Sequence, residues 1–75
     1  MENTNDMLGK RLKEVCQEKG ISYRELAEKV DMPTSRIFRI ANGMTTNPGI
    51  YTMIRICKGL EISLDEFFSD EAFHQ

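Results

Sequence analysis

Residues 22–43 have the sequence SYRELAEKVDMPTSRIFRIANG, which predicts two short helices joined by a tight turn. Ser22 and Glu25 stand three residues apart, the spacing of a capping box, in which two side chains satisfy backbone donors of the first helical turn. The apolar residues that follow recur at helical spacing and predict a buried stripe: Leu26, Ala27 and Val30. The first helix of the pair is therefore expected to begin directly after Ser22.

The second helix of the pair follows a break in this pattern. Residues 31–33 (DMP) interrupt it, because proline cannot continue the preceding helix but is tolerated in the first turn of the next one. We expect the second helix to run from Thr34 to Ala41. Asn42 and Gly43 then end it, since these residue types most easily adopt the left-handed backbone of a helix end.

Length and composition limit the class of protein. A chain of 75 residues makes one domain, and it buries only roughly 60% of its unfolded surface, which leaves no room for a deep catalytic cleft. No apolar run approaches the ~20 residues of a membrane span, and the first residues lack the basic and apolar segments of a signal peptide. We therefore expect a cytoplasmic protein that is not an enzyme, has no catalytic residues and needs no cofactor.

Helices are also expected on both sides of the central pair. Residues 1–6 are expected to fray, and the helix after them has one apolar face, which Gly20 ends: Leu8, Leu12, Val15 and Cys16. Asn47 and Pro48 predict the start of a fourth helix, with Asn47 as the cap and Pro48 in the first turn. Its apolar positions are Ile50, Met53, Ile54, Ile56, Cys57 and Leu60.

A short fifth helix is expected to close the core. Ser63 and Glu66 repeat the capping-box spacing, and the helix carries three apolar residues: Leu64, Phe67 and Phe68. We expect the domain to span residues 7–69, with the central motif at about 22–42 and an acidic tail at 70–75.

The two cysteines are predicted to be core thiols. Cys16 and Cys57 lie in apolar helical stripes, far apart in the chain, and neither belongs to a C-x-x-C or C-x-x-H spacing. A metal site would need His74 as a partner, and a histidine one residue from the end of this sequence is rarely held rigidly. The sequence therefore predicts no metal site.

The helix expected at residues 34–41 has two faces with different chemistry. Ile37, Ile40 and Ala41 share a narrow apolar arc, while the opposite side carries Thr34, Ser35, Arg36 and Arg39. An outward arginine on such a helix can donate two parallel hydrogen bonds to a guanine in the DNA major groove. Arg39 is the best candidate for reading a base, and Arg36, nearer the edge of the polar face, is a candidate for a phosphate contact.

Phe38 lies on the flank of this polar face and allows three interpretations. It fills the edge of the core, contacts a thymine methyl group, or contacts a protein partner. The sequence alone leaves these alternatives open.

The net charge of −2 hides an uneven distribution. Residues 32–60 contain four basic side chains and no acid, whereas residues 61–75 contain five acids and no lysine or arginine. Three further cations lie near the start of the first expected helix, where they could reach a phosphate backbone: Lys10, Arg11 and Lys13. For Lys13 and Arg55, as for Lys19 and Lys29, simple solvation of an exposed face is the favoured interpretation.

From about Leu8 to Phe68 the chain resembles the helix-turn-helix domain of phage-repressor type, the Cro/CI or xenobiotic-response-element family. The resemblance rests on LGKRLK, KGISYRELAEKV, SRIFRIANG, the NP pair and ISLDEFF. It implies an all-α, five-helix, lambda-repressor-like DNA-binding domain whose third helix enters the major groove. It also implies that Thr34, Ser35 and Arg39 face bases, and that Tyr23 and Asn42 contact phosphates.

The chain departs from the family pattern at four positions, one of which is Pro33, where the family usually has a Ser or Thr cap. Many members pair a buried arginine with a glutamate where this chain has Cys16 and Ala41, and loss of both partners together avoids a stranded buried charge. Gly59 replaces a helix former in the fourth expected helix, a loss of about 1 kcal/mol unless another segment approaches closely there.

We therefore expect a regulator of transcription, with a repressor role, that binds double-stranded DNA sequence-specifically. A homodimer with recognition helices ~34 Å apart would suit symmetric DNA. Four apolar residues are candidates for the dimer contact, of which Ile56 and Leu60 have the core as their alternative place: Tyr51, Ile56, Leu60 and Phe73. The alternative is a protein-interaction module, or an antitoxin-type regulator that binds an as yet unidentified protein partner.

Overall fold

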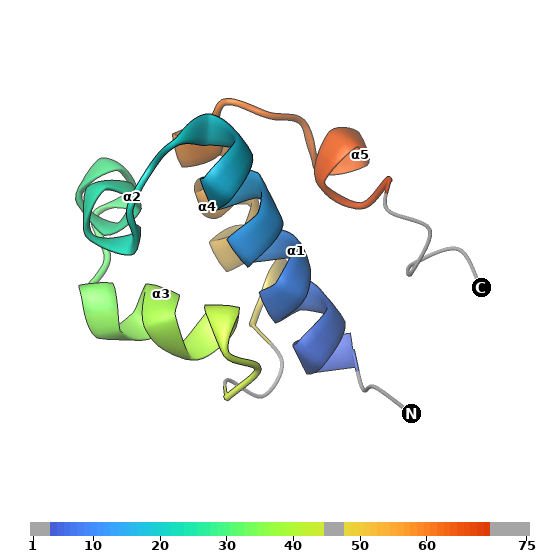
Figure 1. Cartoon of the computed structure of the whole chain (residues 1–75), viewed down its shortest axis with the longest axis horizontal. Coiled ribbons are helices and arrows are strands. Elements are labelled where there is room, and N and C mark those ends of the chain that lie inside the picture. The colour runs from blue at the N-terminus through green and yellow to red at the C-terminus, as the bar shows by residue number, and fades with distance from the viewer. Residues whose placement is uncertain (1–3, 45–47, 70–75) are drawn as a thin grey trace.

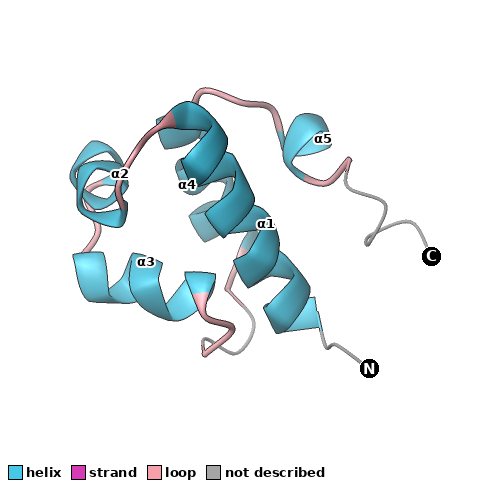
Figure 2. Ribbon diagram, in the orientation of Figure 1, coloured by secondary structure: helices cyan, strands magenta, loops and turns pink. Residues whose placement is uncertain are grey.

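The computed structural model describes residues 4–44 and 48–69, which form helices and connecting loops without a strand (Figure 2). The helices in chain order are α1 (Thr4–Lys19), α2 (Tyr23–Val30), α3 (Thr34–Ala41), α4 (Ile50–Leu60) and α5 (Leu64–Phe67). Figure 1 shows α3 crossing below the pair formed by α1 and α4, with α2 to one side and α5 on the other. The all-α, five-helix prediction is confirmed.

The central pair of helices has the predicted boundaries. The Ser22 hydroxyl accepts a hydrogen bond from the Glu25 backbone N–H at 3.0 Å, and the Glu25 carboxylate accepts one from the Ser22 N–H at 3.2 Å. Asp31 then ends α2 with a left-handed backbone at φ 56°. Pro33 is the N-cap of α3 and supplies no side-chain hydrogen bond.

The start of α4 differs from the prediction. The helix begins at Ile50, with Gly49 as its N-cap in an extended conformation (φ −64°, ψ 160°), so Pro48 lies outside the first turn. Asn47, the predicted cap, falls outside the described residues. Ile50 consequently lies at the outer edge of the first turn and is 61% exposed, so its prediction as a core residue was wrong. At the other end of the chain, α1 already begins at Thr4, inside the segment expected to fray.

The core lies where α1, α2, α3 and α4 meet. Its apolar side chains come from every helix, and those that are fully buried with the largest volume are Leu12, Val15, Leu26, Ile37, Ile56 and Phe67. Ile54, Leu64 and Phe68 are half-buried at its margin. No helix within the described ranges is both long enough and apolar enough to cross a lipid bilayer.

Two glycines allow helices to approach closely. A Cβ atom at Gly9 in α1 would stand 2.4 Å from the Ala41 carbonyl oxygen and 2.9 Å from that of Ile40. A Cβ atom at Gly59 in α4 would stand 2.5 Å from Cγ1 of Val30 in α2. Both glycines therefore offset their low helix propensity by allowing close packing. At Gly59 the segment that approaches is α2, which the sequence alone did not reveal.

Cys16 and Cys57 are free, buried thiols, as predicted. Cys16 and Ala41, which replace a charged pair common in the resembled family, are 4% and 2% exposed. An apolar pair thus fills this part of the core.

Burial of these thiols predicts a loss of stability at alkaline pH. Desolvation raises the pKa of both Cys16 and Cys57 above the ordinary value of 9.0, so the unfolded chain releases these protons first as pH rises. Their contribution to the free energy of unfolding is therefore complete below pH 9.0 and is lost above it. Urea unfolding between about pH 8 and pH 10 should show a smaller decrease for the Cys16→Ala/Cys57→Ala double variant than for the natural protein. Equal decreases in the free energy of unfolding for the two proteins would contradict a raised pKa of the buried thiols.

Candidate nucleic-acid interface

The outer face of α3 is a solvent-exposed strip of polar, cationic and aromatic side chains. Ile37, Ile40 and Ala41 are at most 2% exposed and fix the inner face of the helix on the core. The outer face leaves five side chains exposed to solvent: Thr34, Ser35, Arg36, Phe38 and Arg39. We call these five residues the α3 outer face.

Arg39 and Arg36 differ in how they are held. The Arg36 guanidinium donates a hydrogen bond to the Thr52 hydroxyl at 3.2 Å, which directs it toward the start of α4. The backbone carbonyl of Arg39 accepts a hydrogen bond from the Met44 N–H at 2.9 Å, but the Arg39 guanidinium forms no hydrogen bond or ion pair with any described residue. Its five donors therefore remain available to an external acceptor.

Phe38 is not a core residue, because it is 52% exposed. Its ring meets Tyr23 edge to face, with centroids 6.5 Å apart and an interplanar angle of 72°. The packing joins the first residue of α2 to the α3 outer face. Of the three interpretations from the sequence, the structure removes the core filler and leaves contacts with DNA or with a protein.

Tyr23 presents its phenol as a hydrogen-bond donor. Desolvation by partial burial, with the Cys16 thiol nearby as a smaller cause, raises the pKa of Tyr23 above its usual value of 10.0. The hydroxyl is therefore protonated at neutral pH and can donate to an anionic oxygen.

Asn42 and Lys10 lie together at the other end of α3. The Asn42 side-chain amide donates to the Phe38 carbonyl at 2.8 Å and so caps the helix to which it belongs. Lys10 is exposed on α1, and both residues line an open hollow of about 270 Å³ between α1 and the end of α3. The sequence-predicted residues Tyr23, Asn42 and Lys10 thus flank the α3 outer face.

Arg11 has a different role from the phosphate contact expected from the sequence. Its guanidinium donates to the Phe67 carbonyl at 2.5 Å and the Glu66 carbonyl at 2.7 Å, and it pairs with Glu14. The guanidinium carbon also lies 5.9 Å from the centre of the Phe67 ring, and the side chain is only 10% exposed. Arg11 therefore fastens α5 to α1 and is committed to the fold.

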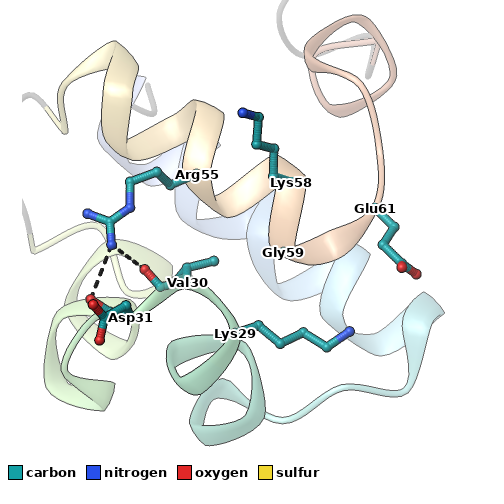
Figure 3. A pocket seen from close by; sticks show the side chains of 7 residues that line it. All are labelled: Lys29, Val30, Asp31, Arg55, Lys58, Gly59 and Glu61. Atoms are coloured by element: carbon teal, nitrogen blue, oxygen red, sulfur yellow. Dashed lines mark hydrogen bonds between the residues drawn. The ribbon is translucent and has the colours of Figure 1, made fainter.

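Arg55 also does more than solvate a surface. Figure 3 shows its guanidinium reaching from α4 to the carbonyl oxygens of Val30 and Asp31 at the end of α2. It donates to both, at 3.2 Å in the case of Asp31. These carbonyls lack partners inside their own helix, so Arg55 fixes the end of α2 just before the turn into α3. Sequence reasoning missed this because the contact spans 25 residues.

The helix-turn-helix family model matches residues 12–67. The HTH-type transcriptional regulator SinR of Bacillus subtilis (strain 168) is 32% identical over 65 residues, which are 87% of this chain and 59% of that protein. The HTH-type transcriptional regulator PuuR of Escherichia coli (strain K12) is 39% identical over 62 residues, covering 83% of this chain and 33% of PuuR. The chain thus spans about 59% of SinR and 33% of PuuR.

Solved structures show the same arrangement of helices. The wild-type restriction-modification controller protein C.Esp1396I superposes with a TM-score of 0.82 at 28% identity, over 91% of this chain and 87% of that one. The controller protein C.AhdI from Aeromonas hydrophila superposes with a TM-score of 0.80 over 85% of this chain and 96% of that one, and at 23% identity it supports the fold alone.

Proposed function

This chain belongs to the helix-turn-helix family, and from that premise we propose that it binds double-stranded DNA sequence-specifically and represses transcription. The observation that carries the proposal is the α3 outer face, where the Arg39 guanidinium has no hydrogen-bond or ion-pair partner among the described residues. The similarity to the transcriptional regulators SinR and PuuR supports a regulatory role.

In the proposed complex, α3 lies in the major groove. Thr34, Ser35, Phe38 and Arg39 face the bases, with Arg39 bidentate to a guanine and Phe38 against a thymine methyl group. The side chains at the edges of the α3 outer face contact the flanking phosphates: Tyr23, Arg36, Asn42 and Lys10. The phosphate contacts set the register of the domain on DNA, and the base contacts select the sequence.

Arg39→Ala is expected to relax or abolish selection of the base that Arg39 reads while leaving the fold intact. Loss of one bidentate contact to guanine removes about 1–3 kcal/mol of discrimination. The measurement is enrichment from a random double-stranded DNA pool at near-physiological salt, with circular dichroism to confirm folding. Lys58→Ala, which removes a cation from α4 away from α3, is the matched control and should enrich the natural motif.

The same experiment tests the proposal as a whole. A motif enriched by the natural protein and lost or relaxed in Arg39→Ala supports DNA reading by α3. A folded natural protein that enriches no sequence would contradict it. Repression is tested separately with a reporter placed behind the enriched motif, where an increase in expression would contradict the repressor role.

A homodimer is part of the proposal, because a palindromic site needs two recognition helices related by a two-fold axis. Of the candidates for the dimer contact, Ile56 and Leu60 are in the core at 0% and 2% exposure, which confirms the alternative given for them and removes them from the contact. Phe73 lies outside the described residues. Tyr51 is 82% exposed on the first turn of α4 and remains the candidate. A palindromic motif from the enrichment would support the dimer, and an asymmetric motif would oppose it.

A protein partner is the second candidate function. It is favoured by four exposed apolar side chains on α3, α4 and the loop between them: Phe38, Met44, Ile50 and Tyr51. Salt distinguishes the two functions, because DNA binding through several phosphates weakens steeply as salt rises, whereas an apolar protein interface responds little.

A further inference from the structure

We propose that Lys13 holds a backbone phosphate at the centre of a cationic strip that connects the start of α2 with the end of α3. This inference rests on the proposed DNA-binding function. It adds a phosphate contact from α1, whereas the sequence alone favoured simple solvation of Lys13. The strip consists of Tyr23, Lys13, Lys10 and Asn42, and we call it the flanking strip.

The helical position of Lys13 places it between the two ends of the strip. Gly9, Lys13 and Cys16 stand at i, i+4 and i+7, so they lie along one side of α1. Gly9 abuts the carbonyl of Ala41 at the end of α3, and Cys16 shares a hollow with Tyr23 at the start of α2. Lys13 therefore stands between α2 and α3 on the side of α1 that both helices meet.

Two surface hollows meet at Lys13. One, of about 540 Å³, lies between α1 and the start of α2 and has Lys13, Gln17, Ser22 and Tyr23 among its lining residues. The other, of about 270 Å³, lies between α1 and the end of α3, and there Lys13 joins Lys10 and Asn42. A lysine that lines both hollows can contact a phosphate of a DNA backbone that passes either the start of α2 or the end of α3.

The charges around Lys13 leave its ammonium group available. No described carboxylate forms an ion pair with it. Glu25 borders the larger hollow, but its carboxylate accepts the Ser22 N–H of the capping box. Asp6 borders the smaller hollow and has an interaction within the domain. The phenol of Tyr23 and the amide of Asn42 are neutral donors, so Lys13 adds a full positive charge to both of the hollows that these residues line.

The test compares the salt dependence of DNA affinity for Lys13→Gln and the natural protein on the enriched motif. Loss of one phosphate contact is expected to weaken binding about 3- to 10-fold at ~100 mM salt and to lower the slope of log affinity against log salt by about 0.9. The preferred sequence should not change, since the contact is to the backbone. Lys13→Arg keeps the charge and should restore most of the slope.

Lys58→Gln is the matched control, because it removes the same charge from α4 and should leave the slope within error of the natural value. If Lys13→Gln and Lys58→Gln have equal slopes, the inference fails while the proposed function stands. If the natural protein enriches no DNA, the proposed function fails first, and this inference fails with it.

Discussion

Phe67→Ala is expected to lower the free energy of unfolding by about 3–5 kcal/mol, because Phe67 is fully buried and its ring fills the space beside α1. The substitution also removes the ring that lies 5.9 Å from the Arg11 guanidinium. A 75-residue domain has a total stability of roughly 4–11 kcal/mol, so this one substitution removes a large share of the free energy of unfolding. Urea unfolding followed by circular dichroism measures the change.

Phe68→Ala is the matched control for this prediction. Phe68 packs edge to face on Phe67 with centroids 5.0 Å apart, but it is only half-buried. Its truncation should cost about 1–2 kcal/mol, in proportion to the smaller area removed from the core. Equal losses for the two variants would contradict the difference in burial between Phe67 and Phe68 described here.

Gly9→Ala is expected to cost about 2–3 kcal/mol net, although alanine is the better helix former by about 1 kcal/mol. The added Cβ atom would stand 2.4 Å from the carbonyl oxygen of Ala41, and a backbone atom cannot rotate away as a side chain can. The end of α3 must therefore shift away from α1. Binding to the enriched DNA motif should weaken in the same variant, because the α3 outer face moves with its helix.

Gly59→Ala and Gly49→Ala provide a graded comparison. The Cβ atom at position 59 would meet only side-chain atoms of Val30, Leu26 and Lys29, and these can adjust in part. The Cβ atom at position 49 would meet nothing within 4 Å. The expected order of destabilisation is Gly9, then Gly59, then Gly49, and it is measured by urea midpoints. A stabilised Gly9→Ala variant would show that helix propensity outweighs the contact.

The sequence predicts the bounds of α2 and α3 closely because their signals are local. Ser22 and Glu25 satisfy each other within one turn, and the proline at position 33 acts on its immediate neighbours. At α4 the same reasoning misplaced the helix start, since Gly49 takes an extended backbone that leaves Pro48 outside the helix.

The candidate site was predictable only where the helical period decides exposure. The division of α3 into an inner face with Ile37 and an outer face with Arg39 follows from 3.6 residues per turn. The roles of Arg11 and Arg55 depend on segments distant in sequence, and no local pattern encodes those contacts. Arg11 was expected on DNA because its charge was visible in the sequence, while its acceptors, 55 and 56 residues away, were not.

The contact between Arg11 and α5 also has a consequence for biosynthesis. The ribosome makes Arg11 early, but the carbonyls of Glu66 and Phe67 that receive its hydrogen bonds are among the last parts of the domain to emerge. Until then the guanidinium has no backbone acceptor in α5, and the core lacks its largest buried ring. A nascent chain stalled before residue 67 should therefore be held in an incompletely packed state, and the domain should close only after synthesis has passed α5.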